Sequence, residues 1–270
     1  MGWLAELPHL LAELSDRWSL TLGQPLDGED VSCAWVAPAV TSAGRALVLK
    51  LGMPHFEGED EIEALRLLDG DPTVRLIEAD NERNAMLLER CEPGTSLRSQ
   101  PETEQDVIIA GLLRRFWRTP AMNHAFRHLS DMLRYWSEET GRDAARWTDS
   151  GLVHEGLRAF EEMAAASPAD VLLAIDLHAG NVLRAEREPW LVIDPKPFVG
   201  DKAYDATQHL LNCRARLRSN AYDTINSFAD LLEVDHERVR RWTFSRLAAE
   251  PRDNWDDELS TLAKLLNRQT

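Results

Sequence analysis

The stretch Val171–Asp205, VLLAIDLHAGNVLRAEREPWLVIDPKPFVGDKAYD, decides the fold. Its two short apolar runs, Val171–Leu173 and Trp190–Ile193, are predicted to be buried strands. A carboxylate follows each run, Asp176 after the first and Asp194 directly at the end of the second. We therefore expect two neighbouring extended segments to bring polar side chains together at their ends.

Asn181 lies five residues beyond Asp176, which gives the pattern Asp-x-His-x-x-Asn, and Asp194 follows eighteen residues after Asp176. This pattern matches what phosphoryl transfer from ATP requires. One acid orients the attacking hydroxyl and accepts its proton, while an Asn and an Asp hold magnesium. The sequence thus predicts Asp176, Asn181 and Asp194 as catalytic residues, with Asn181 and Asp194 as Mg²⁺ ligands. The alternative is a turn that caps a hairpin, with Asp194 an ordinary strand-end acid.

The segments DLHAGNVL and VIDPKPFVGDKAYD resemble the catalytic segment of the aminoglycoside phosphotransferase family, which has a protein-kinase-like fold. They are similar, more narrowly, to its streptomycin 6-kinase and hydroxyurea phosphotransferase branch. The resemblance covers nearly the whole chain and is strongest from Leu173 to Leu211. One departure concerns how the loop is anchored, because Ala174-Ile175 replaces the family's common His-Gly before the catalytic Asp. The resemblance also implies that Asp205 ties a helix start to the catalytic loop.

This resemblance implies an α+β fold with two lobes. Residues 1–91 would form a small nucleotide-binding lobe, an antiparallel sheet with a helix, and residues 92–270 a larger, mainly helical catalytic and substrate-binding lobe. The apolar pattern agrees. Leucines at three- and four-residue steps predict a first helix ending near residues 16–18. The segments WSLTLG, VSCAWVAPAV, RALVLKLG, TVRLIEAD and NAMLLERC predict a sheet of about five strands.

Lys50 lies where a core-facing residue is expected, because alternation in RALVLKLG puts it on the same strand face as Ala46 and Val48. A half-buried lysine needs an anionic partner, and nucleotide phosphates plus a carboxylate would supply one. The alternative is an edge-strand lysine that reaches water. A helix is predicted from Gly58 to Leu68, and the family's Glu-Ala-x-x-Leu pattern implies Glu61 as the partner, with Glu63 as the second choice.

The remaining nucleotide contacts are implied by the kinase-like fold. Ser32 and nearby backbone N–H groups would cover the phosphates, although an ordinary hairpin turn is an equal alternative there. The backbone from Glu89 to Cys91 would hydrogen-bond the adenine, just before a hinge at residues 92–97. Further helices are predicted by apolar spacing at residues 107–117, 129–137, 152–165, 203–217, 221–232, 234–249 and 256–266.

Composition limits the possible partners. The chain has 30 basic and 46 acidic residues and a net charge of −16, which repels nucleic acid and anionic lipid. Three widely spaced cysteines, Cys33, Cys91 and Cys213, indicate reduced thiols, and no signal-peptide pattern is found at the N-terminus. We therefore expect a cytoplasmic monomer or weak homodimer that acts on a small molecule, without nucleic-acid or membrane partners.

Together these features predict an ATP- and Mg²⁺-dependent kinase. The resemblance implies that it phosphorylates a hydroxyl of a streptomycin-type aminoglycoside or hydroxyurea and confers antibiotic resistance by inactivation. Two alternatives remain: a kinase of another small metabolite alcohol, or a kinase-fold nucleotide-binding module without activity. The second is motivated by Ala174-Ile175 and by the lack of a glycine-rich loop.

Overall fold

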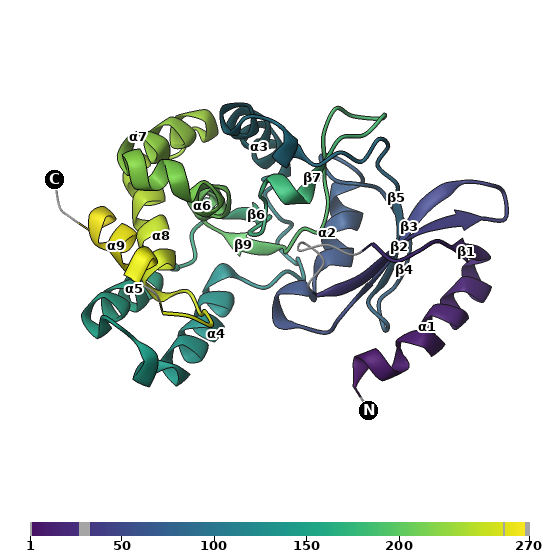
Figure 1. Ribbon diagram of the computed structural model, residues 1–270, viewed down its shortest axis with the longest axis horizontal. Helices are drawn as coiled ribbons and strands as arrows, with labels where there is room; N and C mark the ends of the chain where they lie inside the picture. Colours follow the sequence, from purple (N-terminus) through teal and green to yellow (C-terminus); the bar gives the residue numbers. More distant parts are fainter. Residues whose placement is uncertain (1, 27–32, 256, 268–270) are drawn as a thin grey trace. The chain divides into compact units, whose positions relative to one another are not determined.

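The computed structural model describes residues 2–26, 33–255 and 257–267. The chain divides into two compact units, a first unit of residues 1–97 and 182–194 and a second unit of residues 98–181 and 195–270 (Figure 1). It passes between them three times, after Leu97, Asn181 and Asp194. Relative to the expected lobes 1–91 and 92–270, the first unit also takes in residues 92–97 and 182–194.

The first unit contains the expected antiparallel five-stranded sheet. Its strands are β1 (Leu20–Leu22), β2 (Ala34–Thr41), β3 (Ala46–Gly52), β4 (Leu76–Asp80) and β5 (Ala85–Glu89), in the order β1-β2-β3-β5-β4. The segment TVRLIEAD becomes a strand only from Leu76, because Thr73 at its start pairs with Val192 instead. The sheet therefore places β5 beside β3 and leaves β4 at the edge.

One helix covers each face of this sheet (Figure 1). Helix α1 (Trp3–Trp18) packs through Leu14 against Leu47 and Leu49 of β3. Helix α2 (Glu61–Leu68) packs on the opposite face, where Val48 meets its apolar side. The predicted helix start at Gly58 is wrong, since residues 56–58 form a separate 3₁₀ turn, η1 (Phe56–Gly58). Alternation along β3 thus directs Lys50 to the α2 face.

A short hairpin from later in the chain belongs to the first unit. Strands β7 (Val182–Leu183) and β8 (Leu191–Val192) pair with each other. The Val192 N–H donates to the Pro72 carbonyl oxygen at 3.0 Å, and the Val192 carbonyl oxygen accepts from the Val74 N–H, also at 3.0 Å. These bonds hold the hairpin beside the sheet. They also fix the position of Asp194, which follows the hairpin directly.

The two apolar runs of the opening stretch form strands that belong to different units and do not pair with each other. Strand β6 (Val171–Leu173) pairs with β9 (Phe198–Gly200) in the second unit, whereas Leu191–Val192 pairs with β7 in the first unit. Each run pairs with an apolar strand of its own unit, and the apolar pattern of a short strand does not encode which partner that is.

The second unit is mainly helical, as expected. Its helices are α3 (Glu102–Phe116), α4 (Leu129–Arg142), α5 (Ser150–Met163), α6 (Lys202–Asn212), α7 (Arg214–Leu232), α8 (His236–Ala249) and α9 (Asp257–Leu266), with short 3₁₀ turns η3 (Ala144–Arg146) and η4 (Ala179–Asn181). A further 3₁₀ turn, η2 (Leu97–Ser99), begins at the last residue of the first unit before the chain enters the second. Helix α8 packs against α5, α6, α7 and α9. Gly156 of α5 allows the close approach, because a Cβ there would lie 2.7 Å from that of Ala248. Among the helices so described, none is long and apolar enough to cross a membrane.

The predicted helix at residues 203–217 is wrong in its extent. Helix α6 ends at Asn212, and α7 begins at Arg214 and continues to Leu232. Asn220 within α7 has non-helical angles, φ −157° and ψ 75°. Its carbonyl accepts from the Thr224 hydroxyl at 2.7 Å, so polar side chains there compete with regular helix bonding.

Candidate active site

A buried lysine between two acids lies on the α2 side of the sheet. Lys50 Nζ donates to both carboxylate oxygens of Glu61, at 2.6 and 2.7 Å, and also pairs with Asp194 Oδ1. Lys50 is 6% exposed and Glu61 2%. Burial alone would lower the pKa of the Lys50 ammonium, but the nearby carboxylates of Glu61 and Asp194 outweigh it and raise that pKa. The lysine therefore stays charged and binds two acids.

The neighbouring acid Glu63 lies elsewhere. It is on the exposed side of α2, where its carboxylate pairs with Arg66 and accepts from Asn81 at 3.0 Å. Residues 61 and 63 are two positions apart on a helix and so point to different sides. Within the first unit, the structure thus puts Glu61 and not Glu63 beside Lys50.

Asp194 follows the end of β8 in an unusual backbone conformation. Its φ is +53°, the left-handed region that Asp adopts more readily than most residues other than glycine. The β7–β8 hairpin carries it, and the hairpin is held by Arg187, which donates to both oxygens of Glu89 at 2.8 Å and to the Thr73 carbonyl at 3.0 Å. The meeting of Asp194 with Lys50 therefore depends on contacts inside the first unit.

Asp176 and Asn181 lie in the second unit, on the loop that follows β6. Asn181 Nδ2 donates to the Asp176 carbonyl at 3.0 Å and lies 3.4 Å from its Oδ2. The Gly180 N–H donates to His178 Nδ1 at 3.0 Å, which further closes the turn. Because the amide nitrogen faces Asp176, the amide oxygen of Asn181 is turned the other way. An amide oxygen and the carboxylate of Asp194 are ligand types that Mg²⁺ accepts, so the donor set fits this metal.

Asp205 in the first turn of α6 anchors the backbone just before Asp176. Its carboxylate accepts from the Ala174 N–H at 3.0 Å, the Ile175 N–H at 2.8 Å and the Trp117 indole N–H at 2.8 Å. Ile175 has a φ of +37°, which is costly for a β-branched residue. The three donors hold this strained turn without the His-Gly pair that the resemblance implies.

Burial dominates the titration of this anchor. Asp205 is 1% exposed, and burial raises its pKa to about 6, although the Ala174 N–H, the Trp117 indole and the Ile175 N–H all act to lower it. The carboxylate is therefore ionised at neutral pH, as its three donors require.

The residues expected at the adenine and the phosphates are less informative. Glu89 is in β5, where its N–H donates to the Arg75 carbonyl at 2.9 Å and its side chain binds Arg187. Cys91 is a free, buried thiol, and burial raises its pKa to about 12. Ser32 lies outside the described residues. Their roles in nucleotide binding stay predictions.

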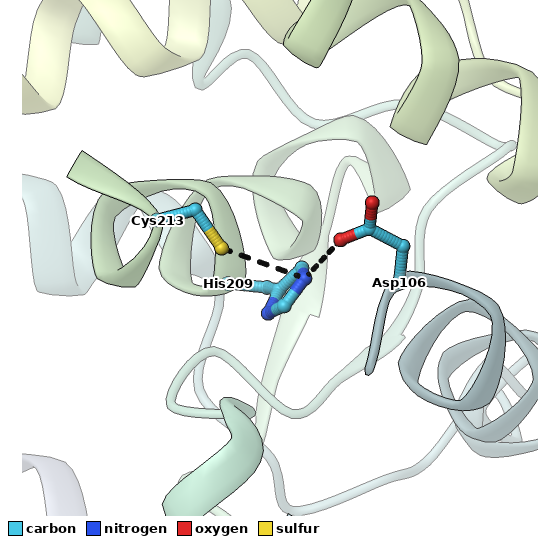
Figure 2. Close-up of side chains that lie close together, drawn as sticks. All are labelled: Asp106, His209 and Cys213. Atoms are coloured by element: carbon cyan, nitrogen blue, oxygen red, sulfur yellow. Dashed lines mark hydrogen bonds and ion pairs between the residues drawn. The ribbon is translucent and has the colours of Figure 1, made fainter. Parts of the chain in front are cut away.

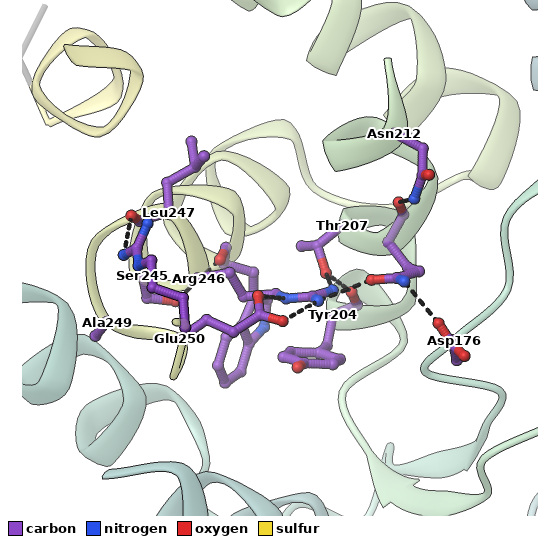
Figure 3. Close-up of polar contacts among 12 residues, drawn as sticks. Asp176, Tyr204, Thr207, Asn212, Ser245, Arg246, Leu247, Ala249 and Glu250 are labelled. Atoms are coloured by element: carbon purple, nitrogen blue, oxygen red, sulfur yellow. Dashed lines mark hydrogen bonds and ion pairs between the residues drawn. The ribbon is translucent and has the colours of Figure 1, made fainter. Parts of the chain in front are cut away.

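Sequence reasoning missed several residues around Asp176. Gln208 Nε2 donates to Asp176 Oδ1 at 2.6 Å, and Arg246 Nη2 donates to Gln208 Oε1 at 2.8 Å (Figure 3). The one available signal was spacing, because Gln208 lies three residues after Asp205 and so faces the same side of α6. Nothing in the sequence pointed to Arg246, which comes from α8.

A second polar cluster, Asp106, His209 and Cys213, is buried in the second unit (Figure 2). His209 Nε2 lies 2.7 Å from Asp106 Oδ1 and 3.9 Å from Cys213 Sγ. Arg216 donates to both oxygens of Asp106, at 3.0 and 2.8 Å.

These contacts favour a hydrogen-bonded core cluster over a metal site. A guanidinium already neutralises Asp106, and burial raises the pKa of the Cys213 thiol to about 12. His209 Nδ1 is buried without a hydrogen-bond partner in the described residues. Metal-binding histidines almost always donate from their second ring nitrogen, which this one does not do.

The fold is that of protein-kinase-like enzymes, as comparison with solved structures shows. A choline kinase from Streptococcus pneumoniae matches with a TM-score of 0.66 and 15% identity, covering 97% of this chain and 93% of that chain. A type I macrolide 2′-phosphotransferase matches with a TM-score of 0.58 and 14% identity, covering 97% of each chain. At such identities the likeness establishes the fold alone.

The particular family follows from sequence comparison. Residues 17–254 match the family described as aminoglycoside/hydroxyurea antibiotic resistance kinases. A streptomycin 6-kinase from Streptomyces glaucescens is 35% identical over 261 residues, covering 91% of this chain and 82% of that protein. A hydroxyurea phosphotransferase from Kitasatospora aureofaciens is 36% identical over 249 residues, covering 89% and 71%. The chain therefore belongs to this family of phosphotransferases, and membership of a kinase family implies the use of ATP.

Proposed function

We propose that this protein transfers the γ-phosphoryl group of ATP to a hydroxyl of streptomycin or hydroxyurea, or of a close analogue, and thereby inactivates it. The observation that carries the proposal is the buried group of Lys50, Glu61 and Asp194. A lysine buried between two acids is unusual, since each buried charge needs compensation. Phosphoryl transfer gives this arrangement a use, because it needs a fixed cation near the phosphates and an acid near the metal.

Each residue has a defined role in this proposal. Lys50, oriented by Glu61, contacts the nucleotide phosphates. Asn181 and Asp194 hold Mg²⁺, which neutralises charge on the phosphates when it is bound. Asp176 orients the acceptor hydroxyl and takes its proton late in the reaction. Ser32 and the backbone of Glu89 to Cys91 contact the phosphates and the adenine. We further propose a cytoplasmic protein that is a monomer or weak homodimer.

The names of the relatives support the choice of acceptor. One is a streptomycin 6-kinase and another a hydroxyurea phosphotransferase, each about equally similar to this chain. Streptomycin is cationic, and a net charge of −16 favours cations near the surface. This favours streptomycin as the first acceptor to test.

The test is an acceptor panel with magnesium-ATP, read as ADP release and as the mass of the product. We expect turnover of streptomycin or hydroxyurea, with a gain of one phosphoryl group. The Asp176→Asn variant should lose about 1,000-fold or more in kcat and still bind the nucleotide. Turnover of neither compound, or full activity of Asp176→Asn, would contradict the proposal.

A further inference from the structure

We propose that Gln208 is a positioning residue that fixes the orientation of the Asp176 carboxylate, and that the buried Arg246–Glu250 pair in turn orients Gln208. This inference rests on the proposed function, because it takes Asp176 as the acid that orients the acceptor. All four residues lie in the second unit. The acid would thus be held by a chain of contacts that begins on α8, far from the loop in sequence.

The chain of contacts is short and continuous (Figure 3). Glu250 accepts from Arg246 Nε and Nη2, both at 2.9 Å. Arg246 Nη2 also donates to Gln208 Oε1 at 2.8 Å, and Gln208 Nε2 donates to Asp176 Oδ1 at 2.6 Å. Along this path every N–H group donates and every oxygen accepts, so no two donors or two acceptors face each other.

Arg246 determines which way the Gln208 amide points. A guanidinium has five N–H donors and no acceptor, so the side chain that faces it must present an oxygen. The amide oxygen of Gln208 therefore turns to Arg246, and its NH₂ group turns to Asp176. A glutamine without this neighbour could flip and present its oxygen to the carboxylate, which would repel it.

Arg246 itself is held in one place. It is buried, and its Nη1 donates to the Thr207 hydroxyl at 2.8 Å. Its guanidinium carbon lies 5.5 Å from the Trp136 ring centre and 5.4 Å from that of Tyr204. Glu250 compensates its charge through two hydrogen bonds. A buried, packed and paired arginine costs little further entropy when it orients a neighbour.

The consequence concerns the geometry of transfer. The Asp176 side chain is partly exposed, at 33%, so burial alone does not restrict its rotation. A hydrogen bond from Gln208 to one carboxylate oxygen limits the directions that the other can take. An error of about 1 Å in placing a reacting group can cost about 100-fold in rate. Gln208 should therefore influence kcat much more than nucleotide binding.

Two substitutions separate a positioning role from a structural one. Gln208→Met keeps the volume and removes the donor. Gln208→Glu keeps the shape and the acceptor for Arg246 but presents a carboxylate to Asp176. If Gln208 only filled space and satisfied Arg246, Gln208→Glu would behave like the wild type. As a matched control, Gln105→Met removes a buried glutamine of α3, whose Nε2 bonds the Gln100 carbonyl.

The measurements are kcat, KM and nucleotide affinity with magnesium-ATP and streptomycin, then hydroxyurea, together with Tm. We expect kcat to fall about 10- to 100-fold in Gln208→Met and further in Gln208→Glu, with nucleotide affinity within about twofold of wild type. Gln105→Met should keep its kcat. Wild-type kcat in Gln208→Glu, or equal losses in Gln105→Met and Gln208→Met, would overturn the inference.

A crystal structure of Gln208→Met gives a second result that needs no turnover. The Asp176 carboxylate should rotate away from its wild-type direction, and an unchanged direction would refute the positioning role. If the wild type phosphorylates neither acceptor, the proposed function fails, and the crystal structure still decides what Gln208 does. If Asp176→Asn is inactive while Gln208→Met has wild-type kcat and an unmoved carboxylate, only the inference about Gln208 fails.

Discussion

The two units hold their acids in different ways. In the first unit, Asp194 and Glu61 meet a cation directly, and opposite charges satisfy one another around Lys50. In the second unit, Asp176 and Asp205 receive neutral N–H donors from Gln208, Trp117 and the backbone. Ion pairs tolerate small shifts, because attraction between charges varies slowly with distance, whereas hydrogen bonds restrict direction. The first arrangement therefore suits charge compensation, and the second suits orientation.

The largest effect is expected when the cation of the first unit is removed. Lys50→Met would leave Glu61 and Asp194 without their shared partner, which should cost about 3–5 kcal/mol of unfolding free energy. Nucleotide affinity should also fall steeply. Lys264→Met is the control, because Lys264 forms an exposed pair with Asp149. Chemical denaturation gives the unfolding free energy of both variants. Similar losses of unfolding free energy in the two would show that the burial of Lys50 does not add to the cost of removing its charge.

The second unit should show a distinctive dependence on pH. Burial raises the pKa of Asp205 from its ordinary value of 3.8 to about 6, so the unfolded chain releases this proton at lower pH than the folded one. Stability from this group is complete below pH 4 and is lost as the pH rises to about 6. The displacement corresponds to about 3 kcal/mol.

The variant Asp205→Asn provides the reference for that measurement. Its side chain does not titrate, so the wild type minus the variant should lose about 3 kcal/mol of unfolding free energy between pH 4 and 7. Denaturant unfolding at a series of pH values gives this difference. A difference that is flat with pH would mean that the donors around Asp205 offset its burial completely.

A smaller contrast should separate two acids of the same helix. Glu61→Gln removes one of the two charges that compensate Lys50, at a cost of about 1–3 kcal/mol. Glu63→Gln removes an exposed partner of Arg66 and should cost under about 0.5 kcal/mol. Thermal unfolding and nucleotide affinity are measured in parallel. Equal effects at positions 61 and 63 would remove the special role of Glu61.

The smallest effect is expected at the hairpin that carries Asp194. Arg187→Met breaks the two hydrogen bonds to Glu89, a partly exposed pair, and should cost about 1 kcal/mol. The affinity for the nucleotide in the presence of Mg²⁺ should fall more than the affinity without Mg²⁺. The reason is that the loosened hairpin carries Asp194, which is a proposed Mg²⁺ ligand. Titration calorimetry with and without Mg²⁺ distinguishes the two, and equal changes would argue against this coupling.

Much of the fold was predictable because local patterns have local causes. Alternation in RALVLKLG assigned Lys50 to a face, and the leucine spacing of α1 gave a helix that packs on the sheet. Errors came where a local pattern left the partner open. The apolar runs Val171–Leu173 and Trp190–Ile193 were correctly predicted to contain strands. Their sequences did not show that the two strands belong to different sheets, since any apolar strand can pair with several others.

The candidate site divides along the same line. Sequence by itself determined that Asp176, Asn181 and Asp194 follow extended segments, and that Lys50 faces inward. The resemblance implied Glu61 as the partner of Lys50, and the structure puts its carboxylate there. Tertiary structure alone decided the three donors on Asp205 and the path from Arg246 through Gln208 to Asp176. The reason is physical: strand and helix periods depend on neighbours in sequence, whereas compensation of buried charge depends on whichever groups packing brings within hydrogen-bond distance.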